Sequence, residues 1–225
     1  MSLRGGGALA RVAAMAAVAV AILRPILFSA GVPALRHDWI WPLTPGGVAA
    51  AMLNLSAPVV GTNWNAAGWL PRIDVVQPLV LLANAAAGPA IALRVLLLAI
   101  LLTASVGAYR LAKSYGAREA PALLAALWYT AAPFAVVELV AGHLWILAAY
   151  AAFPHAVEAL LARRRWYAAF FWFATTAIDV HFLGFDLLAM LALALVGGVR
   201  PREMGGAFAG LCAFVPSLIG VAFAA

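Results

Sequence analysis

Long apolar runs are the feature of this sequence that most restricts its fold. The run over residues 8–30 and several later ones reach the ~18 to 20 residues that a helix needs to cross ~30 Å of hydrocarbon. Hydrophobic residues make up 67% of the chain and charged residues only 10%, and this composition is typical of a membrane protein. Because backbone groups in lipid must be paired within their own segment, we predict an all-α polytopic membrane protein.

The runs predict about seven transmembrane helices in a single transmembrane domain, residues 1–225. The first run is longer than the ~7 to 15 residues of a signal-peptide core, so it is expected to be an uncleaved anchor. The fifth and sixth runs are short, and residues 166–197 form either two spans or one re-entrant pair. The six later spans are expected at residues 88–111, 121–141, 144–161, 167–178, 183–196 and 207–223.

Basic residues predict the orientation of the spans. They flank alternate ends of the runs, at Arg4 and Arg11, at Arg110, Lys113 and Arg118, at Arg163–Arg165, and at Arg200 and Arg202. By the positive-inside rule these segments are cytoplasmic. We therefore expect a protein of the cell membrane whose N-terminus is cytoplasmic. Residues 31–87 are expected to form a long outer loop with interfacial helices. The charges are spread over separate short loops, which favours contact with membrane lipids and argues against nucleic-acid binding.

The outer loop concentrates ionisable and aromatic side chains. Tryptophan favours the water–lipid boundary, and its ring also stacks on sugars, so anchoring and ligand binding both stay open for this group. A carboxylate placed directly after a span suggests a functional site at the membrane surface. The candidate residues are Arg36, His37, Asp38, Trp39 and Trp41, followed later by Arg72 and Asp74.

Further ionisable residues fall inside or at the ends of the apolar runs. A charge at membrane depth costs ~2.5 to 3.5 kcal/mol on insertion scales, so it normally faces a partner or a cavity. With the predicted topology, Glu138, His143, Asp179 and His181 all lie near the outer face, on the same side as Asp38. We therefore expect these four residues to take part in substrate binding.

Two other groups of ionisable residues have less specific interpretations. Asp179, His181 and Asp186 suit either a divalent metal or a polar group that satisfies itself, and the metal, Mg²⁺ or Mn²⁺ among the options, stays unknown. Glu158 lies about one turn before Arg163–Arg165, which predicts that it pairs with these arginines.

Several catalytic classes are disfavoured by missing motifs. The sequence has no His-Glu-x-x-His, no Gly-x-Ser-x-Gly and no Walker-type phosphate loop, which argues against a zinc or serine hydrolase and against ATP-driven transport by this chain alone. Cys212 is the single cysteine, so an intrachain disulfide is excluded.

The segment from His37 to Pro42, together with Tyr129-x-x-x-Pro133-Phe134 and Gly142-His143, resembles the GT-C superfamily of integral-membrane glycosyltransferases and the related YfhO-like membrane proteins. The resemblance extends over roughly residues 8–196. It implies that a sugar is transferred from a polyprenyl-phosphate donor at the outer face of the membrane. It also implies that Asp38, as the acidic residue of the first outer loop, is the general base.

Two other functions remain open from the sequence. Buried Asp, Glu and His groups also mark the ion paths of secondary transporters. The chain is shorter than most members of the superfamily, which is compatible with a noncatalytic lipid-binding subunit, or a fragment of a longer glycosyltransferase, that acts with a partner subunit.

Overall fold

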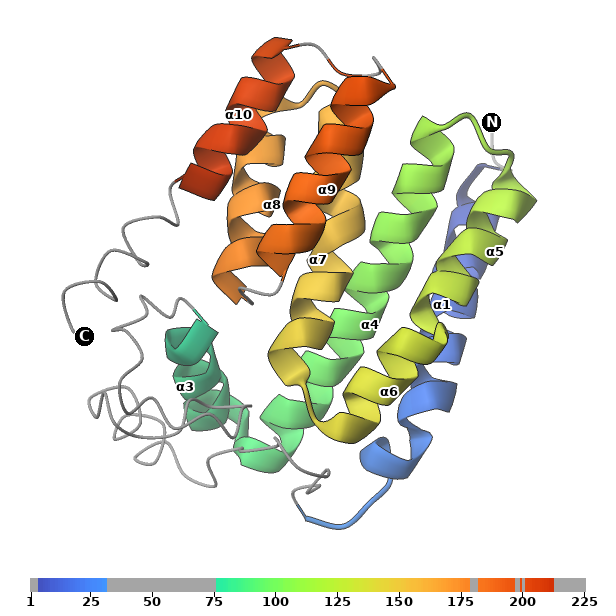
Figure 1. The fold of residues 1–225 in the computed structure, drawn as a ribbon. Coiled ribbons are helices and arrows are strands. Elements are labelled where there is room, and N and C mark those ends of the chain that lie inside the picture. Colours follow the sequence, from blue (N-terminus) through green and yellow to red (C-terminus); the bar gives the residue numbers. More distant parts are fainter. Residues whose placement is uncertain (1–3, 32–75, 179–181, 197–198, 200, 213–225) are drawn as a thin grey trace, which may run out of the picture.

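The fold is a bundle of α-helices (Figure 1). The computed structural model describes residues 4–31, 76–178, 182–196, 199 and 201–212, and no strand occurs among them. The helices are α1 (Arg4–Leu27), α3 (Val76–Ala87), α4 (Pro89–Ser114), α5 (Glu119–Thr130), α6 (Pro133–Ala141), α7 (Leu144–Leu161), α8 (Arg165–Ile178), α9 (Phe182–Leu195) and α10 (Pro201–Cys212).

Four helical segments of the described chain are long and apolar enough to cross a membrane. They are Gly7–Leu27 in α1, Pro89–Ser114, Glu119–Ala141 and Leu144–Leu161. The first four predicted spans agree with these segments to within three residues at each end. The expected multi-pass, all-helical membrane protein is therefore confirmed at this coarser level, whereas the total of seven spans and the long outer loop stay predictions.

The third span consists of two helices with a short interruption. Helix α5 ends at Thr130 and α6 begins at Pro133. Ala132 has an extended backbone, with φ −56° and ψ 143°, as expected for a residue that precedes proline. Proline fits the first turn of a helix because its missing N–H would have no intrahelical partner there. Pro133 therefore begins α6 after the interruption.

Helices α8 and α9 are short for complete spans. Each has 14 residues, which corresponds to a length of ~21 Å against a hydrocarbon thickness of ~30 Å. The ring of Phe182, the first residue of α9, lies 6.1 Å from that of Phe153, which is near the middle of α7. This geometry favours the re-entrant alternative for residues 166–197. The last predicted span, 207–223, extends beyond the described residues.

Helix α7 is the central helix of the bundle, between α4 and α8 (Figure 1). Its span is 72% buried, compared with 22 to 44% for the other three spanning segments. Residues of α7 contribute to two apolar clusters. One cluster joins it to α1, α4 and α6, and the other joins it to α8, α9 and α10. Helix α7 therefore connects the two halves of the fold.

The contact between α4 and α7 requires a glycine. A Cβ atom at Gly107 would lie 2.6 Å from Cδ2 and 2.8 Å from Nε2 of His155. The same imidazole Nε2 lies 3.0 Å from the carbonyl oxygen of Thr103, one turn before Gly107. The missing side chain thus lets the imidazole reach the α4 backbone, in the way that small residues allow close helix approach in membranes.

We expect Gly107→Ala to destabilise the protein by about 1 to 3 kcal/mol, because the added methyl group displaces the ring of His155. The matched control is Gly184→Ala in α9, where an added Cβ meets no atom within 4 Å. The control should be neutral or stabilising, by up to ~1 kcal/mol. Equilibrium unfolding of both variants in one detergent measures the difference, and equal stabilities would contradict this account.

Candidate functional site

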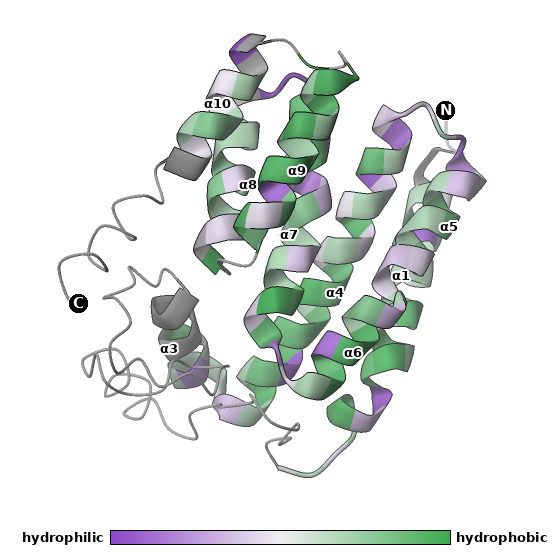
Figure 2. Ribbon diagram, in the orientation of Figure 1, coloured by the Kyte–Doolittle hydropathy of each residue, from purple (hydrophilic) through white to green (hydrophobic). Residues whose placement is uncertain are grey.

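The two ends of the bundle differ in charge. Most basic residues of the described helices gather at the end where α4 meets α5 and α7 meets α8, which we call the basic end. It contains Arg11, Arg110, Lys113, Arg118, Arg163 and Arg164. We call the opposite end, where α1 ends, α4 begins and α6 joins α7, the His143 end. The described arginines at this end are Arg24 and Arg94. Apolar residues predominate in the helices between the two ends (Figure 2).

At the His143 end, Glu138 and His143 form a direct pair. Oε2 of Glu138 lies 2.5 Å from Nδ1 of His143. Helix α6 stops at Gly142, whose φ of 86° is readily adopted only by glycine. The N–H groups of Gly142 and His143 both donate to the carbonyl oxygen of Glu138. This tight turn brings two residues that are five apart in sequence into contact.

The Glu138–His143 pair is accessible and chemically versatile. The carboxylate is 15% exposed and the imidazole 32% exposed, so both are partly accessible at the end of the bundle. A carboxylate that bonds one ring nitrogen fixes the orientation of the imidazole. Such a pair can transfer a proton or donate to a phosphate oxygen.

Arg94 is a second polar centre at the His143 end, and sequence reasoning missed it. Its Nη2 donates to the carbonyl oxygens of Ser29 at 2.6 Å and Gly31 at 2.8 Å, and its Nε donates to that of Ile26 at 3.1 Å. These carbonyls lie at and just beyond the end of α1, where helical partners run out. Arg94 therefore positions the point at which the chain leaves α1. An arginine within an apolar run was the signal that the sequence offered.

A pair of tyrosines packs beside the interruption between α5 and α6. The rings of Tyr129 and Tyr150 are stacked, with centroids 4.1 Å apart. Each hydroxyl donates to the backbone carbonyl of the other residue at 2.9 Å. These bonds satisfy the polar groups of both residues, so the pair connects the third span to α7 as a structural contact.

The other predicted site residues lie outside the described part of the chain. This holds for Asp38 with its neighbours Arg36, His37, Trp39 and Trp41, for Arg72 and Asp74 in the same predicted loop, and for Asp179 and His181 between α8 and α9. The described residues contain no group of three His, Cys, Asp or Glu side chains that could hold a metal ion. Of the predicted site residues, the structure therefore brings together Glu138 and His143.

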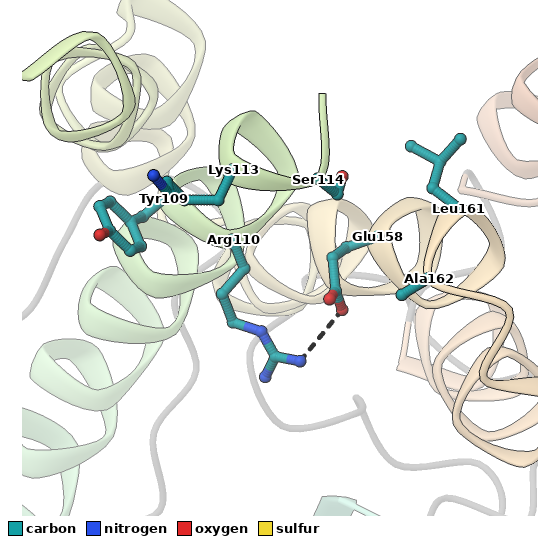
Figure 3. Close-up of a pocket in the computed structure, with 7 residues that line it drawn as sticks. All are labelled: Tyr109, Arg110, Lys113, Ser114, Glu158, Leu161 and Ala162. Carbon is teal, nitrogen blue, oxygen red and sulfur yellow. Dashed lines mark hydrogen bonds and ion pairs between the residues drawn. The ribbon is translucent and has the colours of Figure 1, made fainter. Parts of the chain in front are cut away.

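The basic end contains a cavity of about 460 Å³ between α4 and α7. Arg110 and Glu158 are among the residues that line it, and Figure 3 shows the guanidinium directed toward the carboxylate. Nη2 of Arg110 is 3.1 Å from Oε2 of Glu158. The predicted pairing of Glu158 with Arg163–Arg165 is therefore wrong, because the side chain of Glu158 faces α4 and finds its partner there.

Comparison with known proteins gives no relative. No protein-family model, no curated protein and no solved structure matches this sequence significantly. The functional argument therefore depends on the residues themselves.

We expect Arg110→Met to destabilise the protein by about 1 to 3 kcal/mol, because the nearly buried Glu158 loses its charged partner. The control is Arg118→Met, an exposed change at the same end, which should alter the unfolding free energy by less than about 0.5 kcal/mol. Denaturant unfolding in detergent measures both effects. Adding Glu158→Gln to the Arg110→Met protein should restore part of the loss, and no restoration would contradict the pairing argument.

Proposed function

We propose that this protein is a membrane glycosyltransferase of the GT-C type, which transfers a sugar from a polyprenyl-phosphate donor at the outer face of the membrane. The observation that carries the proposal is the accessible Glu138–His143 pair at the end of the bundle opposite the basic end. The positive-inside rule predicts that the basic end is cytoplasmic, and in that orientation this pair would face the outer leaflet. A lipid-linked donor presents its phosphate at that level.

The chain geometry supports a role for Asp38 near this end. Arg94 holds the carbonyl oxygen of Gly31 at the end of α1, and Asp38 follows seven residues later. A residue spans at most ~3.3 to 3.6 Å, so seven residues of chain reach at most ~25 Å. This tether is shorter than the ~30 Å thickness of the hydrocarbon. It favours placing the carboxylate on the same side of the membrane as His143.

In the proposed reaction, Asp38 accepts the proton of an acceptor hydroxyl. The hydroxyl oxygen attacks the anomeric carbon, the bond from that carbon to the phosphate oxygen breaks, and polyprenyl phosphate leaves. A single displacement inverts the anomeric configuration. The departing phosphate needs hydrogen-bond donors, and we assign this role to His143, oriented by Glu138, with Arg36 and Arg72. The remaining predicted binding residues, His37, Trp39, Trp41, Asp74, Asp179 and His181, are proposed to contact the sugar or the lipid.

A secondary transporter is the second candidate, and the helix geometry favours it specifically. The third span is interrupted between α5 and α6, and α8 with α9 forms a pair of short helices. Interrupted helices surround the substrate sites of many transporters. Transport of a solute without glycosyl transfer would support this candidate.

The proposed function is tested by donor binding and sugar transfer. We expect purified protein to retain added undecaprenyl phosphate in native mass spectrometry, and Arg72→Ala to weaken this retention. Asp38→Asn should keep the lipid and lose transfer of radiolabelled hexose from undecaprenyl-phosphate hexose to a membrane extract. A loss of ~10²- to 10⁴-fold is expected for a positioned general base.

The control for the transfer assay is Glu119→Gln, which removes an exposed carboxylate at the basic end and should preserve activity. Full transfer by Asp38→Asn would overturn the assignment of the base. Lipid retention without transfer by the wild-type protein would favour a noncatalytic lipid-binding subunit.

The proposed orientation has its own test, because replacing Cys212 removes the only natural thiol. In a Cys212→Ser background, we expect a membrane-impermeant maleimide to label Ala30→Cys on intact cells and Ser114→Cys only after permeabilisation. Both positions are exposed, and they lie at opposite ends of the bundle. The reverse labelling pattern would place the basic end outside and contradict the proposal.

A further inference from the structure

Asp186 is a fully buried carboxylate with one unused oxygen. It lies one turn into α9, and its side chain has no exposed surface. Its Oδ2 accepts hydrogen bonds from the hydroxyls of Thr175 at 2.6 Å and Thr176 at 2.9 Å, both from α8. Its Oδ1 is buried and has no hydrogen-bond partner among the described residues. An unpaired buried oxygen of this kind normally has a ligand or a function that explains it.

No described cation neutralises this carboxylate. Helices α7, α8 and α10 pack against α9. On α7, His155 contacts the carbonyl oxygen of Thr103 and Glu158 pairs with Arg110, both on α4. The described ionisable side chains on α8 and α10, Tyr167 and Arg202, are exposed. An ionised carboxylate in such surroundings is costly, and among the described side chains none offsets its charge, so a small cation from solution would stabilise it.

The surroundings of Asp186 are also suited to reversible binding of a cation. The two threonine hydroxyls donate to Oδ2 and so stabilise the ionised form of the carboxylate. The lone pairs of Oδ1 remain available to a cation. The site lies near the start of α9, whose first residue, Phe182, contacts Phe153 near the middle of α7. A small cation bound there would sit deep within the fold, between two short helices.

We propose that Asp186 is the binding site for a small monovalent cation, a proton or Na⁺, within the α8–α9 pair. A proton would form an O–H bond at Oδ1, and Na⁺ would be coordinated by Oδ1 together with hydroxyl oxygens of the threonines. Either ion neutralises the same carboxylate. The site is separate from the Glu138–His143 pair, so the inference does not depend on glycosyl transfer.

The experiment uses the full chain purified into lipid nanodiscs, with two readouts that distinguish the two ions. Infrared spectroscopy detects the carbonyl stretch of a protonated carboxyl group, which shifts in D₂O. Binding of ²²Na⁺ detects the sodium form. Wild type is compared with Asp186→Asn, which has nearly the same shape and can still accept the threonine hydrogen bonds, and with Glu119→Gln as the control carboxylate variant.

We expect wild type and Glu119→Gln to show either the protonated carboxyl band or saturable ²²Na⁺ binding, and Asp186→Asn to lose that signal. Loss of the band identifies a proton, and loss of bound sodium identifies Na⁺. If wild type shows neither the carboxyl band nor ²²Na⁺ binding, the proposal is overturned, whatever the variants show. Retention of the full signal by Asp186→Asn would overturn it as well.

Discussion

The close contact between α4 and α7 is the interaction on which the rest of the structure depends. On α4, Thr103, Gly107 and Arg110 follow one another at helical spacing and face His155 and Glu158 of α7. His155 hydrogen-bonds the carbonyl oxygen of Thr103 and packs closely on Gly107. Arg110 forms an ion pair with Glu158. Helix α7 in turn packs on α8. The α4–α7 contact therefore connects the half of the fold that contains Arg94 with the half that contains Asp186.

Hydropathy was sufficient to predict the long helices but not the details within them. The lengths of apolar runs follow directly from the thickness of the bilayer, and the prediction for residues 144–161 coincides with α7. The interruption before Pro133 was not predicted, although an internal proline is a signal for a helix break, because the apolar run continues on both sides of it and was assigned as one span. The pairing of Glu158 was also wrong, since helical spacing identifies neighbours on the same helix and cannot identify a partner on another one.

The candidate site shows the same limit. Topology predicted that Glu138 and His143 lie at the same end of the membrane, but their direct contact depends on the left-handed turn at Gly142. Arg94 was visible in the sequence as an arginine within an apolar run, but its partners are backbone carbonyls, and these could not be identified from the sequence. For Asp38 and the aromatic residues beside it, the sequence argument and the short tether to Gly31 are the basis of the proposal.

Three ionisable residues within the apolar helices illustrate how differently a charge can be accommodated there. Arg94 spreads its charge over the carbonyls at a helix end, where unpaired acceptors are available anyway. Glu158 is neutralised by Arg110. Both solutions are permanent, because each partner belongs to the protein. Asp186 has only neutral hydroxyl donors on one oxygen and no described partner on the other. A carboxylate without a permanent counter-charge among the described residues is suited to an exchangeable one, and this separates Asp186 from the structural charges of the bundle.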